Sequence, residues 1–70
     1  MSQTVTPEEV GRRLRELRGD RKQRAVAREM GITPMALSNY ERGKMLPRDE
    51  KKVVLADYYG KTVEQIFFTL

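Results

Sequence analysis

The sequence contains no cysteine and no histidine among its 70 residues. Without cysteine it cannot form a disulfide bond or a thiolate metal site, and without histidine it lacks the commonest general base. Its longest apolar runs span a few residues, whereas a membrane helix needs about 20. The first residues, MSQTVTPEE, are polar and acidic and do not resemble a signal peptide. We therefore expect a soluble, cytoplasmic protein with no bound metal, no cofactor and no membrane contact.

The same absences argue against an enzyme. Many of the remaining acidic residues lie where helices are expected to begin, and there a carboxylate stabilises the helix dipole. The sequence has neither a glycine-rich phosphate loop nor a cluster of metal ligands. A chain this short buries only about 60% of its unfolded surface, which leaves little room for a ligand-sensing pocket. We expect neither catalysis nor a small-molecule ligand.

Basic residues are unevenly distributed along the chain, whose formal net charge is +4. Residues 11–28 contain eight arginines and lysines against two acidic residues, a local charge of +6, and the remaining residues sum to −2. Such a cluster predicts a polyanionic partner such as nucleic acid. A solvated, arginine-rich helical surface is the alternative that charge alone leaves open.

Start and stop signals predict five helices in one domain that spans residues 1–70, with residues 1–5 as a flexible N-terminus. The first helix begins after Thr6, with Pro7 in its first position, and Glu9 is spaced to complete a capping box. Gly19 ends this helix. Its apolar stripe falls at i, i+4 and i+7 and consists of Val10, Leu14 and Leu17.

The next two helices are joined by only three residues. The second is expected over about residues 22–30, with Gly31 as its C-terminal glycine. The third follows Thr33 as its N-cap, with Pro34 in its first position, and extends to about Arg42. Because the connection is so short and contains a glycine, the two helices must cross steeply, which is helix-turn-helix geometry.

Two further helices are predicted after a loop. The fourth covers about residues 49–59, and its expected core-facing residues are Val53, Leu55, Ala56 and Tyr59. The fifth lies within residues 62–70, TVEQIFFTL, where Thr62 and Gln65 can form a capping box. A strand is the alternative for this segment because it is rich in β-branched and aromatic residues.

The register of residues from Gln23 onward resembles the lambda-repressor/Cro-like helix-turn-helix family of small transcriptional regulators. The matching positions are Gln23, Ala27, Gly31, Leu37, Tyr40-Glu41-x-Gly43 and Pro47. With GRRLRELR as the first helix and VVLADYYGKTVEQIF as the last two, the likeness covers residues 10–67 or so. It implies an all-α, compact five-helix DNA-binding domain. The chain departs from the family pattern in a shorter segment before Gln23, and Lys52 stands at a commonly apolar position.

The third helix is expected to have two different faces. Helical periodicity directs Leu37 and Tyr40 toward the core, and it directs four residues outward: Met35, Ser38, Asn39 and Arg42. A major groove admits such a helix. The candidates for base contact are Asn39, Met35, Ser38 and, through shape or apolar contact only, Pro34. Solvent exposure without any DNA contact is the alternative for Met35 and Asn39, and a phosphate contact is the alternative for Ser38.

Phosphate contacts are expected around this outward face. The resemblance implies that Gln23, at the start of the second helix, bonds a phosphate. The other candidates are basic or hydroxyl residues that flank the presumed groove: Arg24, Thr33, Arg42, Lys44 and Arg48. For Thr33, a helix-capping role explains the residue without DNA. Phosphate contacts would hold the register without choosing a sequence.

Glu41 is expected to have a structural role. Its carboxylate falls beside Tyr40 on the inner side of the third helix, and an exposed carboxylate there would repel DNA. Arg18, at the end of the first helix, resembles the family's partner for this glutamate. The resemblance therefore implies a partly buried ion pair between Arg18 and Glu41.

These features predict a sequence-specific DNA-binding transcriptional regulator, most simply a repressor that binds double-stranded DNA as a homodimer on a two-fold operator. The dimer interface is expected in the C-terminal part of the domain, at Val54, Tyr58, Phe68 and Leu70. Folding of these side chains back onto the core is the alternative. A rival function is an antitoxin or antirepressor that acts mainly through a protein partner.

Overall fold

The structure, a computed structural model, describes residues 5–69 and consists of five α-helices. They are α1 (Pro7–Arg18), α2 (Gln23–Met30), α3 (Pro34–Glu41), α4 (Asp49–Tyr59) and α5 (Val63–Phe67). The predicted all-α fold with five helices is confirmed, and α4 has the predicted bounds. The strand alternative for residues 62–70 is wrong over residues 63–67, which form α5. Leu70 and residues 1–4 of the predicted flexible N-terminus lie outside the described residues.

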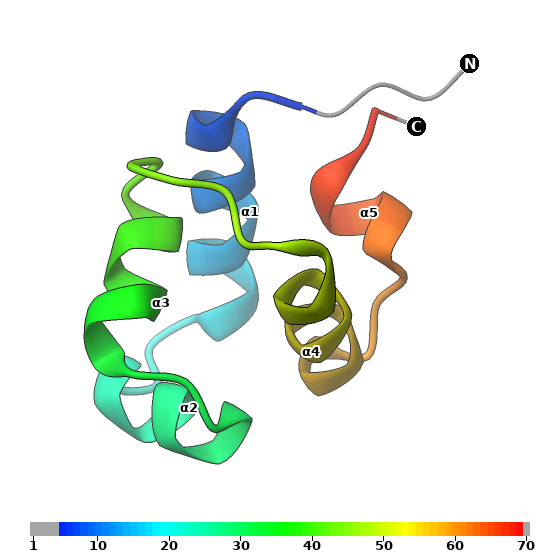
Figure 1. Ribbon diagram of the computed structural model, residues 1–70. Helices are drawn as coiled ribbons and strands as arrows, with labels where there is room; N and C mark the ends of the chain where they lie inside the picture. Colours follow the sequence, from blue (N-terminus) through cyan, green and yellow to red (C-terminus); the bar gives the residue numbers. More distant parts are fainter. Residues whose placement is uncertain (1–4, 70) are drawn as a thin grey trace.

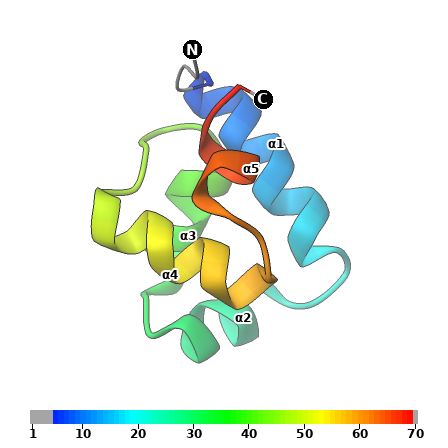
Figure 2. The same ribbon diagram turned by 90° about the vertical axis from the view of Figure 1, so that its right-hand side faces the viewer.

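The five helices enclose one small core. Figure 1 shows α1 in the middle, with α2 and α3 on one side of it and α4 and α5 on the other. In Figure 2, α4 crosses in front of α3, α2 lies below α4, and α5 lies between α4 and α1. Helix α1 packs against α3 and α5, α2 against α3 and α4, and α4 against α5. The completely buried core side chains come from every helix: Val10, Leu14, Val26, Ala27, Leu37, Leu55, Ile66 and Phe67.

Threonine caps begin three of the helices. The hydroxyl groups of Thr6, Thr33 and Thr62 each accept a hydrogen bond of 3.0–3.1 Å from the backbone N–H three residues later. At α5 the capping box is complete, because Gln65 also accepts from the Thr62 N–H at 2.8 Å. At α1 the predicted box is half formed, since the Glu9 carboxylate accepts hydrogen bonds from two arginines instead.

Helix α4 differs from prediction in the side chains that it turns inward. Val53 was expected in the core, but 58% of it is exposed. The inward stripe is Lys52, Leu55, Ala56 and Tyr59, which follows the i, i+3, i+4, i+7 spacing of one helix face. The ammonium of Lys52 lies over the ring of Phe67, 5.8 Å from its centre, which is a cation–π contact. Lys52 therefore faces inward at a position where apolar residues are common in the family.

Within residues 5–69, none of the helices has the length and apolar character needed to cross a membrane.

Candidate nucleic-acid interface

Helices α2 and α3 form the helix-turn-helix that the spacing predicts. Gly31 ends α2 in the left-handed conformation, with a φ of 77°, which a residue with a side chain adopts only at a cost. The next N–H, that of Ile32, donates to the Ala27 carbonyl at 3.0 Å, and Thr33 then caps α3. Ala27 is completely buried, so its small side chain lets the two helices meet closely.

Helix α3 buries one face and exposes the other. Leu37 is completely buried and Tyr40 nearly so, and these two side chains seat the helix on the core. On the opposite face, Met35 is 68% exposed. The other candidates for base contact are also accessible, since Pro34 is exposed and Ser38 and Asn39 are partly exposed. All four candidate side chains are thus accessible in the structure.

The candidate phosphate contacts are all at least partly accessible. Thr33 and all four basic candidates are exposed: Arg24, Arg42, Lys44 and Arg48. Arg24 and Thr33 also line a shallow hollow together with Pro34, Ile32 and Arg28. Arg28 was not among the residues predicted from the sequence. The signal for it was present, because Arg28 follows Arg24 by four residues and so lies on the same face of α2.

The ends of three helices meet at one buried carboxylate. Arg18 donates to Glu41 through Nε at 2.8 Å and through Nη2 at 3.0 Å, which gives a bidentate ion pair. The Glu41 side chain is only 2% exposed, and that of Arg18 is 20% exposed. Gln23 donates to the same carboxylate at 2.9 Å. The hydrogen bond to Glu41 raises the pKa of Arg18, so the guanidinium keeps its charge. The ion pair that the resemblance implies is present, and Gln23 belongs to it.

A family model described as a helix-turn-helix domain matches residues 9–66. The chain belongs to the helix-turn-helix family. This match, together with the solved structure described next, confirms the likeness to DNA-binding domains of the lambda-repressor/Cro type and identifies the protein as a DNA-binding transcriptional regulator. The structure is similar to the crystal structure of the clp gene regulator ClgR from C. glutamicum, with a TM-score of 0.74 and 26% sequence identity over 91% of this chain and 86% of that chain. No curated protein shows a significant match.

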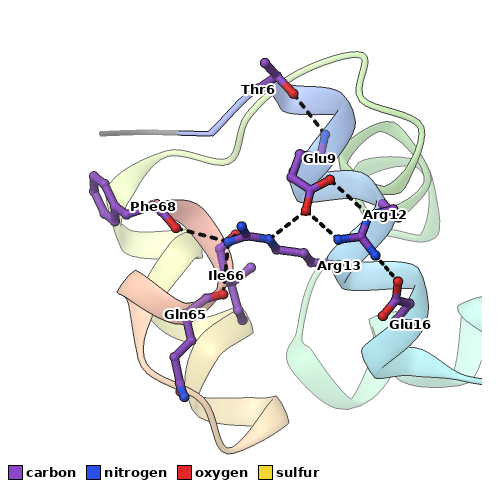
Figure 3. Close-up of polar contacts among 8 residues, drawn as sticks. All are labelled: Thr6, Glu9, Arg12, Arg13, Glu16, Gln65, Ile66 and Phe68. Atoms are coloured by element: carbon purple, nitrogen blue, oxygen red, sulfur yellow. Dashed lines mark hydrogen bonds and ion pairs between the residues drawn. The ribbon is translucent and has the colours of Figure 1, made fainter. Parts of the chain in front are cut away.

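The basic cluster in this helix-turn-helix domain is mostly engaged within the molecule. Arg13 lies between α1 and the end of α5, where its Nη1 is 3.1 Å from three carbonyl oxygens (Figure 3), those of Gln65, Ile66 and Phe68. Its Nε donates to Glu9, which also binds Arg12. These two guanidinium groups, Arg12 first, lower the pKa of Glu9 to about 2. Arg13 is therefore an internal cap for α5.

Other arginines of this segment have internal partners as well. Arg15 donates to the Glu41 carbonyl oxygen at the end of α3. Arg21 donates to the Leu17 carbonyl and lies 5.6 Å from the ring centre of Tyr58. The local charge of +6 therefore overestimates the positive charge that this segment has available to bind a polyanion. Within residues 5–69, the basic side chains of this segment without an internal partner are Lys22, Arg24 and Arg28.

Two of the candidate dimer residues make contacts within the domain. The Tyr58 hydroxyl donates to Glu29 and accepts from Arg21 at 3.3 Å, and the Tyr58 ring packs against the core. Phe68 also packs against the core. Both side chains contact the core and remain partly exposed, so the dimer interface stays a prediction. Val54 is partly exposed.

Tyr59, which follows Tyr58 in the sequence, has a buried hydroxyl group whose effect on stability can be tested. Its hydroxyl oxygen is buried and has no hydrogen-bond partner among residues 5–69, and burial raises its pKa to about 12. We expect Tyr59→Phe to keep or raise the melting temperature at pH 7, because no hydrogen bond is lost. The wild type should lose stability from pH 10 to 12, since only the unfolded chain then releases the Tyr59 proton.

Thermal melts at neutral and alkaline pH measure both effects. Tyr59→Phe should retain more of its stability at alkaline pH than the wild type does. Tyr58→Phe is the matched control, because it removes a hydroxyl with two partners and should lower the melting temperature at pH 7. A larger loss at pH 7 for Tyr59→Phe than for Tyr58→Phe would show that Tyr59 has a partner.

Proposed function

We propose that the protein is a sequence-specific transcriptional repressor that binds a two-fold DNA operator as a dimer, with α3 in the major groove. The observation that carries the proposal is the division of α3: its inner face is sealed by Leu37 and Tyr40, and its outer face presents accessible polar and apolar side chains. Within residues 5–69 no group of acidic side chains is arranged to hold a metal ion. Binding, without catalysis, is the proposed activity.

The outer face of α3 has the chemistry needed to read base edges. The Asn39 amide can donate and accept at the same time, which matches the N6 and N7 atoms of adenine. Met35 can contact a thymine methyl group, and Ser38 can donate to or accept from a base. Pro34 has no N–H and adds only shape. Because Asn39 is the one amide on this face, we propose that it contributes most to sequence choice.

Side chains around α3 can hold the DNA backbone. Arg24, Arg42, Lys44 and Arg48 are exposed cations, and Arg28 joins them beside Arg24. The Thr33 oxygen accepts from the Ala36 N–H, which leaves its hydroxyl proton for a phosphate. Gln23 keeps one amide proton after its bond to Glu41. These contacts would fix the position of α3 without choosing a sequence.

Selection of bound sequences from a random pool of DNA duplexes tests this proposal. A repressor dimer should select a two-fold consensus whose half-sites lie about one helical turn apart, at roughly 34 Å. With about six phosphate contacts, the affinity should fall with salt at a log–log slope near −5. A protein-interaction module such as an antitoxin or antirepressor is the second candidate, and it would give no consensus and a flat salt response.

Two substitutions separate base reading from phosphate binding. We expect Asn39→Ala to weaken binding to the selected duplex by about 1–3 kcal/mol and to relax the preference at one base pair. Lys44→Ala should weaken binding to all duplexes to the same extent and reduce the salt slope by about one. Fluorescence anisotropy with selected and scrambled duplexes measures both.

Lys61→Ala is the control for these variants, because Lys61 is an exposed cation on the connection between α4 and α5, away from α3. Equal weakening on both duplexes by Asn39→Ala would rule out a base contact.

A further inference from the structure

Gln23, Arg18 and Glu41 occupy related positions in three helices. Arg18 is the last residue of α1, Gln23 is the first residue of α2 and Glu41 is the last residue of α3. The Glu41 carboxylate accepts two hydrogen bonds from Arg18, at 2.8 and 3.0 Å, and one from Gln23, at 2.9 Å. One buried group therefore fixes where α2 begins relative to the end of the helix that carries the base-reading side chains.

The bond to Glu41 also fixes the orientation of the Gln23 amide. A glutamine amide has two N–H donors, and Glu41 takes one of them. The second N–H remains for another acceptor beside the first turn of α2. The α2 N-cap, Lys22, makes no side-chain capping bond, so the backbone N–H groups of this turn are open to the same acceptor.

We infer that Glu41 is a positioning residue for DNA binding, which acts by holding the Gln23 amide in the orientation that receives a backbone phosphate. Arg18 has two functions in this arrangement. It neutralises the carboxylate, so an approaching phosphate meets no net negative charge, and it fixes the carboxylate itself through two bonds. A side chain that is held in its bound orientation before binding loses less entropy on binding.

The inference rests on the proposed function, and it differs from a purely structural role for the ion pair. A structural pair would stabilise the fold and leave the effect of Gln23 on DNA affinity unchanged. A positioning pair would lose its effect on affinity once Gln23 is removed. A double-mutant cycle measured on affinity distinguishes these two roles, because it isolates the coupling between sites in contact.

The cycle compares wild type, Gln23→Ala, the paired variant Arg18→Met/Glu41→Met, and the triple variant. The paired change removes one positive and one negative charge, so the net charge and the ionic contribution to binding stay the same. It also avoids a stranded buried charge, which favours folding. Circular dichroism sets a temperature at which all four proteins are folded. The probe is a mixed-sequence duplex of about 30 base pairs at about 50 mM salt, where backbone contacts dominate.

We expect Gln23→Ala to lower the affinity about tenfold, the size of one charge-assisted hydrogen bond. The paired variant should lower it about fivefold in the wild-type background and less than about twofold in the Gln23→Ala background. Equal losses in both backgrounds would overturn the inference, as would a Gln23→Ala protein with wild-type affinity. Absence of DNA binding by the wild type would instead refute the proposed function.

NMR of the wild type provides a measurement that needs no variant. The side-chain amide of Gln65 is the internal control, because Gln65 is exposed and, among residues 5–69, only its amide oxygen has a hydrogen-bond partner. The Gln23 amide protons should exchange with water more slowly than those of Gln65, and one of the two should shift when the mixed-sequence duplex is added. Exchange as fast as that of Gln65, or no shift with bound DNA, would contradict a fixed amide at a phosphate.

Discussion

Arg18→Met should lower the free energy of unfolding by about 3 kcal/mol, because it leaves the buried Glu41 carboxylate without its cation. In the native protein Arg18 supplies two of the three side-chain N–H groups that the carboxylate accepts. Gln23 alone would then have to stabilise a charge that is almost completely removed from water. Small domains have roughly 5–15 kcal/mol in total, so this loss is a large fraction of the stability. Urea unfolding followed by circular dichroism measures it.

Two controls separate the burial of the charge from the loss of an arginine. Arg12→Met removes a guanidinium that also binds carboxylates, those of Glu9 and Glu16, but on the exposed side of α1. It should change stability little, because exposed pairs are well solvated. Arg18→Met/Glu41→Met should be more stable than Arg18→Met, since no charge is stranded. If Arg18→Met and Arg12→Met cost the same, the buried-pair account is wrong.

Gly11→Ala should destabilise the protein by about 2–3 kcal/mol, although alanine is the better helix former by about 1 kcal/mol. Gly11 is buried where α1 crosses the end of α3. A Cβ there would lie 2.9 Å from the Glu41 carbonyl carbon, 3.0 Å from the Tyr40 oxygen and closer still to the Glu41 oxygen. These are backbone atoms, so α3 must shift to make room.

Gly60→Ala is the matched control for Gly11→Ala. Gly60 has a φ of 69°, and a Cβ there would meet nothing within 4 Å. Gly60→Ala should therefore lower the stability only through the left-handed conformation, by about 1–2 kcal/mol. In thermal melts, the melting temperature of Gly11→Ala should therefore be lower than that of Gly60→Ala. A Gly11→Ala protein more stable than the wild type would show that helix propensity, not the α1–α3 crossing, governs this position.

Helix limits were predictable because their signals are local. Thr6, Thr33 and Thr62 each lie three residues from the N–H that they cap, so the sequence contains both partners. The bounds of α4 follow from Gly60 after it and Pro47 before it. The two faces of α3 follow in the same way, because periodicity alone separates Leu37 from the residues opposite.

The residues whose environment was predicted wrongly are those whose contacts lie far away in the sequence. Val53 was assigned inward because α4 has apolar residues on several sides, and only contacts with α2 and α5 decide which stripe is buried. Arg13 was counted as surface charge, although its partners on α5 lie more than 50 residues later in the chain. The close crossing at Gly11 is likewise invisible in the sequence, where glycine in a helix reads only as a weak position.

Titration of the ¹⁵N-labelled protein with the selected DNA duplex shows which face of the domain contacts DNA. We expect the largest chemical-shift changes on the first turn of α2, on residues 33–39, and on Arg42 and Lys44. The surface between α1 and α5, which includes Lys61 and Gln65, should change little. The largest changes on that surface, with α3 unaffected, would contradict the claim that α3 enters the major groove.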